Sequence, residues 1–139
     1  MTAPRPSYVL DAFAVLALFR DEPGADAVED LIRRARQGDA FLAMSVVNLG
    51  EVVYRTIRER GVEAAADALA RIGELPVEAV EVDRALATDA AYLKGRHRIS
   101  YADCVAAALA RRLGATLVTG DPDFRVLESL LTVEWLPTT

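Results

Sequence analysis

Four acidic residues occupy positions at which a carboxylate is unusual, and together they suggest one site. Asp11 comes directly after a short apolar run, and Asp121 follows a β-branched run after one glycine. Glu51 and Asp103 interrupt the apolar faces of expected helices, where an unpaired carboxylate is costly. If the four converge, mutual repulsion raises their pKa values unless a divalent cation lies among them. A set of carboxylate oxygens favours Mg²⁺ or Mn²⁺ over zinc.

Each of these acids also has a structural explanation that needs no shared site. Asp121 precedes a proline and could be the N-cap of a helix, while Asp103 ends a Ser-x-x-Asp sequence that resembles a capping box. Glu51 could form an ordinary ion pair with Arg55 one helical turn later. Asp11 has the weakest explanation, because only the apolar helix after it could use a cap. These are four separate explanations, whereas one shared site accounts for all four acids.

Short apolar runs alternate with helical patterns along the chain. We expect strands over residues 7–10, 41–44, 77–82, 116–119 and 133–136. We expect helices over residues 12–19, 25–37, 46–60, 62–72, 83–93 and 100–113. The alternation predicts a single α/β domain, residues 1–139, with three α/β/α layers and a mainly parallel sheet of about four to five short strands. Ligands of such sheets bind where the strands end, and Asp11 and Asp121 both follow a strand.

Composition favours one globular domain. The chain has 139 residues, of which 53% are hydrophobic and 27% are charged, and this excludes a disordered protein. The net charge of −5 argues against a globally basic nucleic-acid binder. The four candidate carboxylates would account for most of that charge, so the rest of the chain is nearly neutral and a local basic path remains open.

Cysteine usage and hydropathy bear on the compartment. The single cysteine, Cys104, excludes an internal disulfide framework and a cysteine-rich zinc site. No apolar run approaches the roughly 18 residues of a membrane span, and the first residues lack the pattern of a signal peptide. We therefore expect a cytoplasmic protein that does not associate with membranes.

Four segments in register resemble the PIN-domain family, and most closely its VapC toxins from toxin–antitoxin pairs. The segments are Tyr-Val-Leu-Asp11, Asn48-x-x-Glu51, Ser100-Tyr-Ala-Asp103-Cys and Val118-Thr-Gly-Asp121-x-Asp123. They span essentially the whole chain. The resemblance implies a PIN-like fold in which Asp11 and Asp103 are the main ligands of Mg²⁺ or Mn²⁺, with Glu51 and Asp121 completing a catalytic site that cleaves RNA. Asp123 is a further candidate acid.

One position departs from the family pattern. Many members carry Ser, Thr or Asn two residues after the first aspartate, where this chain has Phe13. The polar support of Asp11 must then come from elsewhere, and Thr119 and Asn48 are the candidates. His97 is the only histidine and falls in a polar segment over residues 94–98, where we expect a surface or RNA-contacting role rather than a general base.

An RNA substrate requires positive charge near the acids, and the resemblance also implies protein partners. Basic residues follow Glu51 and precede Asp103, and solvated helix ends are the alternative interpretation of them. The candidate RNA contacts are Arg55, Arg58, Lys94, Arg96 and Arg98. The family further implies a homodimer and a cognate VapB-like antitoxin whose C-terminal segment blocks the site.

Three other functions are compatible with parts of this pattern. The chain could be a PIN-domain nuclease that acts in RNA processing outside toxin–antitoxin systems. It could instead be a catalytically weak binding module of the same fold, with Phe13 as the mark of lost activity. A receiver-type signalling domain also places acids at strand ends, but it needs a lysine near the end of the last strand. The sole lysine, Lys94, is expected between helices, which disfavours that function.

Overall fold

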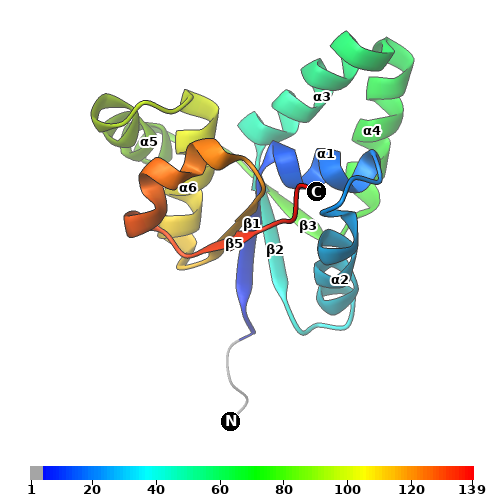
Figure 1. Ribbon diagram of the computed structural model, residues 1–139, viewed down its shortest axis with the longest axis horizontal. Coiled ribbons are helices and arrows are strands. Elements are labelled where there is room, and N and C mark those ends of the chain that lie inside the picture. The colour runs from blue at the N-terminus through cyan, green and yellow to red at the C-terminus, as the bar shows by residue number, and fades with distance from the viewer. Residues whose placement is uncertain (1–4) are drawn as a thin grey trace.

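Five short strands form one sheet in the computed structural model, which describes residues 5–139 (Figure 1). The strands are β1 (Ser7–Leu10), β2 (Phe41–Ser45), β3 (Val77–Val80), β4 (Thr116–Thr119) and β5 (Val133–Trp135). Their order is β3-β2-β1-β4-β5, and every neighbouring pair is parallel. The mainly parallel sheet expected from the alternating pattern is confirmed.

Helices cover both faces of this sheet. They are α1 (Ala12–Phe19), α2 (Ala25–Arg36), α3 (Val46–Arg60), α4 (Val62–Glu74), α5 (Arg84–Arg96), α6 (Tyr101–Leu113) and the 3-10 helix η1 (Pro122–Leu130). Figure 1 shows α1 to α4 on one side of the strands and α5, α6 and the orange η1 on the other. The three-layer α/β/α architecture is therefore confirmed.

The two core layers explain why the central strands are apolar throughout. Val9 and Leu117 belong to the core formed with α5, α6 and η1. Their strand neighbours Leu10 and Val118 belong to the other core, formed mainly with α1 and α2. All four side chains have no exposed surface. Successive residues of a strand point to opposite faces, so a sheet covered on both sides has no polar face.

Some boundaries differ from those expected from the sequence. The polar segment 94–98 predicts a loop, but α5 continues through Arg96. Lys94 stabilises the turn that follows, because its ammonium donates a hydrogen bond of 2.7 Å to the carbonyl of Ile99. The strand expected to reach residue 82 ends at Val80, because its partner strand β2 ends opposite at Ser45, where α3 begins.

Two glycines near helix ends behave differently from each other. The helix α4 runs through the exposed Gly73 to Glu74, although glycine at that position predicts its end. Gly114 ends α6 as expected, with a left-handed backbone at φ +60°. Within residues 5–139, no helix combines the length and the apolar character that a membrane span requires.

Candidate metal centre

The candidate site lies where β1 and β4 end side by side. Leu10 pairs with Val118, so Asp11 and Thr119 follow at the same edge of the sheet. One carboxylate oxygen of Asp11 accepts a hydrogen bond of 2.9 Å from the amide of Ala14 and caps α1. The other accepts a hydrogen bond from the hydroxyl of Thr119, which itself accepts one of 3.0 Å from the amide of Asp121. Thr119 therefore links the acids that follow the two strands.

Three more carboxylates come together above this edge. Asp103, Asp121 and Asp123 each offer an oxygen, and these oxygens lie within 4.8 Å of one another. Asp103 is held in the first turn of α6, where the hydroxyl of Ser100 accepts a hydrogen bond of 3.1 Å from its amide. Asp121 caps η1 by accepting one of 2.9 Å from the amide of Asp123. The cap considered for Asp121 is therefore formed. Of the Ser100–Asp103 capping box the described residues show only the hydrogen bond to the Ser100 hydroxyl, so the Asp103 carboxylate is not used as a cap.

Glu51 approaches the cluster from α3 with one oxygen unpartnered. Its Oε2 lies 3.6 Å from a guanidinium nitrogen of Arg55, which is the ion pair considered from the sequence. Its Oε1 is buried and has no hydrogen-bond partner among the described residues. An unsatisfied buried carboxylate oxygen costs free energy, and a cation or an ordered water would satisfy it. A divalent cation at the site would explain why this oxygen is buried without a hydrogen-bond partner.

Burial and mutual repulsion raise the pKa values of two of these acids. Burial raises the pKa of Asp11 to about 8 although Thr119 and the amide of Ala14 donate hydrogen bonds to it, and the charges of Asp103 and Asp121 raise it further. Burial likewise raises the pKa of Asp103 to about 7 against the hydrogen bond with Ser100.

The carboxylates that add to the raised pKa of Asp103 are those of Asp121, Glu51 and Asp123. Asp103 and Asp11 are coupled as well, because the charge of Asp103 contributes to the pKa of Asp11. The five acids thus form one electrostatic unit. Without a cation, Asp11 and Asp103 retain protons near neutral pH, and a bound divalent ion would displace them.

The structure divides the five acids into two groups. Asp103, Asp121 and Asp123 each have a carboxylate oxygen within 4.8 Å of the other two, whereas Asp11 and Glu51 lie outside this group and flank it. Asp123, only a further candidate from the sequence, is thus as well placed for a cation as Asp121. The signal for this was the Asp-x-Asp spacing directly after a strand.

Asn48 supports the site indirectly. It is fully buried, and its carboxamide oxygen accepts a hydrogen bond of 2.6 Å from Ser45. Its carboxamide nitrogen donates a hydrogen bond of 3.2 Å to the carbonyl of Ala102, next to Asp103. Within residues 5–139 the hydrogen bonds of the Asn48 side chain go to Ser45 and Ala102, and Asp11 is not among its partners. Asn48 joins the start of α3 to the start of α6, and so sets the position of Glu51 relative to Asp103.

Phe13 occupies the space beside the backbone that joins Thr119 to Asp121. A Cβ atom at Gly120 would lie 2.4 Å from Cε1 of Phe13, well inside contact distance. In its present position the ring leaves no room for a side chain at position 120, so a larger residue there would have to displace it. The ring offers no polar group, and the hydroxyl of Thr119 takes the supporting role beside Asp11.

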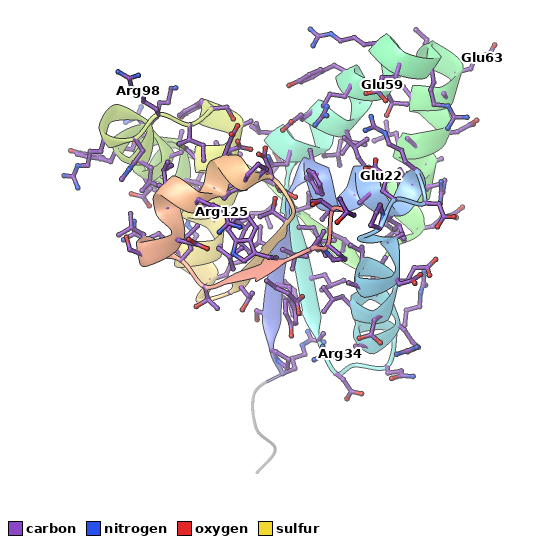
Figure 2. All side chains as sticks on the ribbon, viewed as in Figure 1. Glu22, Arg34, Glu59, Glu63, Arg98 and Arg125 are labelled. Atoms are coloured by element: carbon purple, nitrogen blue, oxygen red, sulfur yellow. The ribbon has the colours of Figure 1, made fainter. Side chains whose placement is uncertain are left out.

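The basic residues expected to contact RNA have different surroundings. Arg55 pairs with Glu51 at the site, and Arg58 lies over the ring of Tyr54 at 4.9 Å. Arg96 lies over the ring of Tyr92 at 6.0 Å. The two remaining candidates are Lys94, whose ammonium is held by the carbonyl of Ile99, and Arg98, which is exposed. Figure 2 shows Arg98 on the outer side of the α5–α6 group.

Fold and site together define a class: a three-layer α/β domain that gathers carboxylates at the carboxyl edge of a parallel sheet. The family model described as PIN domain matches residues 8–130, and the chain belongs to this family. The receiver-type alternative is thereby set aside. A comparison with curated protein sequences gives no match.

Solved structures with the same fold come from several bacteria. VapBC2 from Rickettsia felis, bound to a DNA fragment from its promoter, is 20% identical with a TM-score of 0.75, over 94% of this chain and 99% of that one. VapC20 from Mycobacterium tuberculosis, described as a sarcin-ricin loop cleaving toxin, is 23% identical with a TM-score of 0.74 over the same shares. VapBC-1 from nontypeable Haemophilus influenzae is 19% identical with a TM-score of 0.69, over 93% of this chain and 97% of that one.

Proposed function

We propose that this PIN domain is an endoribonuclease that depends on Mg²⁺ or Mn²⁺ and is the toxin of a VapBC-like pair. The observation that carries the proposal is the convergence of five acids on one sheet edge, with a buried oxygen of Glu51 left unpartnered. Gathering like charges in a buried place destabilises the folded protein, so stability alone does not explain this arrangement.

The donor set suits a hard cation. Among the described residues, the one group that offers three ligand atoms within 4.8 Å consists of the carboxylates Asp103, Asp121 and Asp123. Asp11 and Glu51 flank this group and would complete the ligation directly or through water. Oxygen ligands with room for water are typical of Mg²⁺ and Mn²⁺ sites that also hold a phosphate.

A bound divalent cation would offset charge on the phosphodiester and promote the ionisation of water for hydrolysis. The chain supplies orientation and proton acceptance. Both oxygens of Asp11 are engaged, by Thr119 and by the amide of Ala14, so Asp11 is held in one orientation. The Oε1 atom of Glu51 has no partner among the described residues and is free to accept a proton or a hydrogen bond from water.

The test is cleavage of RNA in Mn²⁺ by the wild-type protein, D11N, D103N and a matched control, D39N. Asp39 is exposed and precedes β2, so it lies at the opposite edge of the sheet. We expect the wild type and D39N to cut RNA, EDTA to stop both, and D11N and D103N to lose most activity. If the wild type cuts and both site variants cut equally well, the proposal is wrong.

The toxin assignment requires protein partners. VapBC complexes are among the structures that share this fold, which supports a VapB-like antitoxin as the partner. The acidic cluster would attract a basic side chain from the antitoxin's C-terminal segment. We also propose a homodimer, for which the exposed apolar side chains Val47, Tyr54 and Ile57 of α3 are candidate contacts.

The antitoxin is tested by looking for a small reading frame directly upstream of the gene and co-expressing its product with this protein. A stable complex that blocks cleavage supports the toxin assignment. Cleavage with no such neighbour would favour a PIN nuclease of RNA processing, and sedimentation of the isolated protein tests the dimer.

A further inference from the structure

A group of basic side chains lines a pocket on the α5–α6 side of the molecule, apart from the acidic cluster. This pocket of about 520 Å³ is formed by α5, α6 and the end of η1. Three arginines and the only histidine line it, together with one acid and an exposed tyrosine: Arg96, His97, Arg111, Arg112, Asp89 and Tyr92. In a chain with a net charge of −5, such a local excess of basic groups is unusual.

The arginines of this pocket are not all committed to structural roles. Arg112 is held by the carboxylate of Asp83 through two hydrogen bonds of 3.1 and 3.0 Å. Within residues 5–139, Arg96 and Arg111 form no ion pair, and both are exposed. Two guanidinium groups thus remain available beside a third that is fixed in place.

The chemistry of the pocket matches a nucleic-acid strand. Guanidinium groups bind phosphates through paired, charge-assisted hydrogen bonds. Tyr92 is 65% exposed, and Arg96 lies over its ring at 6.0 Å. An exposed aromatic ring beside arginines offers a surface on which an unpaired base can stack. Groups suited to binding a phosphate and to stacking a base therefore line one pocket.

The pocket and the acidic cluster share one helix. Arg111 comes eight residues after Asp103 on α6, a rise of about 12 Å. Each strand of duplex DNA carries one phosphate per roughly 3.4 Å of axis, and at that spacing the distance corresponds to three or four nucleotides. His97, which lines the pocket, belongs to the segment that joins α5 to α6, and this segment leads into the turn of α6 that holds Asp103.

We propose that the α5–α6 pocket binds RNA phosphates three or four nucleotides away from the bond that the acidic site cleaves. This inference rests on the proposed nuclease function and names a substrate-binding site separate from the acids. The pocket would bind the flanking strand and supply affinity that the negatively charged centre cannot.

The experiment compares R111E and R96E with R36E, which makes the same change in net charge. Arg36 lies in the last turn of α2, as Arg111 lies in the last turn of α6. The end of α2 lies near Arg34 in Figure 2, far from Arg98 and the α5–α6 group. Cleavage of RNAs of two to twelve nucleotides is followed in Mn²⁺, and binding of the twelve-nucleotide RNA is measured with D103N as the background to prevent cleavage.

We expect KM of the wild type to fall as the RNA lengthens beyond about four nucleotides. R111E and R96E should remove this gain and weaken binding of the longest RNA about tenfold, while R36E behaves as the wild type. The slope of log K against log salt should fall by about 0.7 for each phosphate that a variant no longer binds.

Three other outcomes would contradict either the RNA-binding pocket or the proposed nuclease function. Equal KM values and salt slopes for R111E, R96E and R36E would overturn the pocket while leaving the nuclease intact. A change in oligomeric state without a change in RNA binding would make the pocket a protein interface and would also overturn the inference. If the wild type cuts no RNA at any length, the proposed function fails, whereas loss of RNA binding in the two pocket variants would still support the pocket.

Discussion

The hydroxyl of Thr119 joins two acids that are 110 residues apart in the chain, Asp11 and Asp121. It donates to the carboxylate of Asp11 and accepts from the amide of Asp121, and it is fully buried. A buried hydroxyl with both a donor and an acceptor partner has one orientation. Thr119 therefore fixes the carboxylate of Asp11 relative to the start of η1, where Asp121 and Asp123 lie.

Replacing Thr119 tests whether this orientation matters. T119V keeps the shape of the side chain but removes the hydrogen bond, so we expect cation affinity or cleavage to fall by about tenfold to a hundredfold. T119S should restore most of the loss because it restores the hydroxyl. T116V, at the other end of the same strand, is the control. RNA cleavage is measured against Mn²⁺ concentration, and a T119V protein as active as T116V would show that the link has no role.

Stability without metal should fall as the pH rises. The pKa of Asp11 is about 8 and that of Asp103 about 7 in the folded chain, against an ordinary value of 3.8 for an aspartate. Between pH 4 and 8 the folded state therefore binds more protons than the unfolded state, and the free energy of unfolding decreases with pH. Each unit of pKa difference is worth about 1.4 kcal/mol.

Denaturant titrations at pH 5, 6.5 and 8, with and without Mn²⁺, measure this dependence. Mn²⁺ should flatten the decline, because it takes the place of the protons. D11N should also flatten it in the absence of metal. A metal-free protein whose stability is the same at pH 5 and pH 8 would contradict the raised pKa values.

The contact between Phe13 and Gly120 predicts a strong coupling between two substitutions. G120A places a methyl group against the ring of Phe13 and should destabilise the protein by about 1–3 kcal/mol. In F13S the space is open, so adding G120A there should cost much less. G73A is the control, since nothing lies within 4 Å of that position in α4, and it should stabilise by about 0.5–1 kcal/mol. Equal effects of G120A with and without the ring would show that the two do not touch.

Asp123 should prove a full member of the cation site. Its oxygen lies within 4.8 Å of those of Asp103 and Asp121, so D123N should weaken Mn²⁺ binding at least tenfold. D39N provides the same change of charge at the opposite edge of the sheet. Calorimetric titration with Mn²⁺ makes the comparison, and equal affinities for D123N and D39N would remove Asp123 from the site.

Much of the fold follows from local sequence signals. The strand before Asp11 and the strand before Gly120 have the bounds expected, because each apolar run stops at a residue that disfavours strands. The end of α5 differs from the expected one, because glycine at position 95 and the polar residues around it suggest a loop. The hydrogen bond from Lys94 to Ile99, which stabilises the turn after the helix, cannot be inferred from composition. The order of the strands also depends on packing rather than on local pattern.

Some features of the site can likewise be predicted from local sequence, and others depend on how the strands pack. The rule that ligands bind at strand ends places Asp11 and Asp121 together without any knowledge of strand order. The contacts of Thr119 with Asp11 and of Phe13 with Gly120 require β1 and β4 to be neighbours, which no local signal states. The pocket between α5 and α6 is only partly signalled by the sequence. Arg96 and His97 stand in a basic segment that suggests RNA contacts, whereas Arg111 and Arg112 look like an ordinary basic helix end.

Whether the five acids form one cation site is measured most directly by electron paramagnetic resonance, which reports free Mn²⁺. The wild-type protein, D103N and D39N are titrated with Mn²⁺ at pH 7.5. We expect the wild type and D39N to remove Mn²⁺ from solution with similar affinity, and D103N to bind it at least tenfold more weakly. Equal binding by D103N and the wild type would refute a shared cation site, as would a wild-type protein that leaves all the Mn²⁺ free.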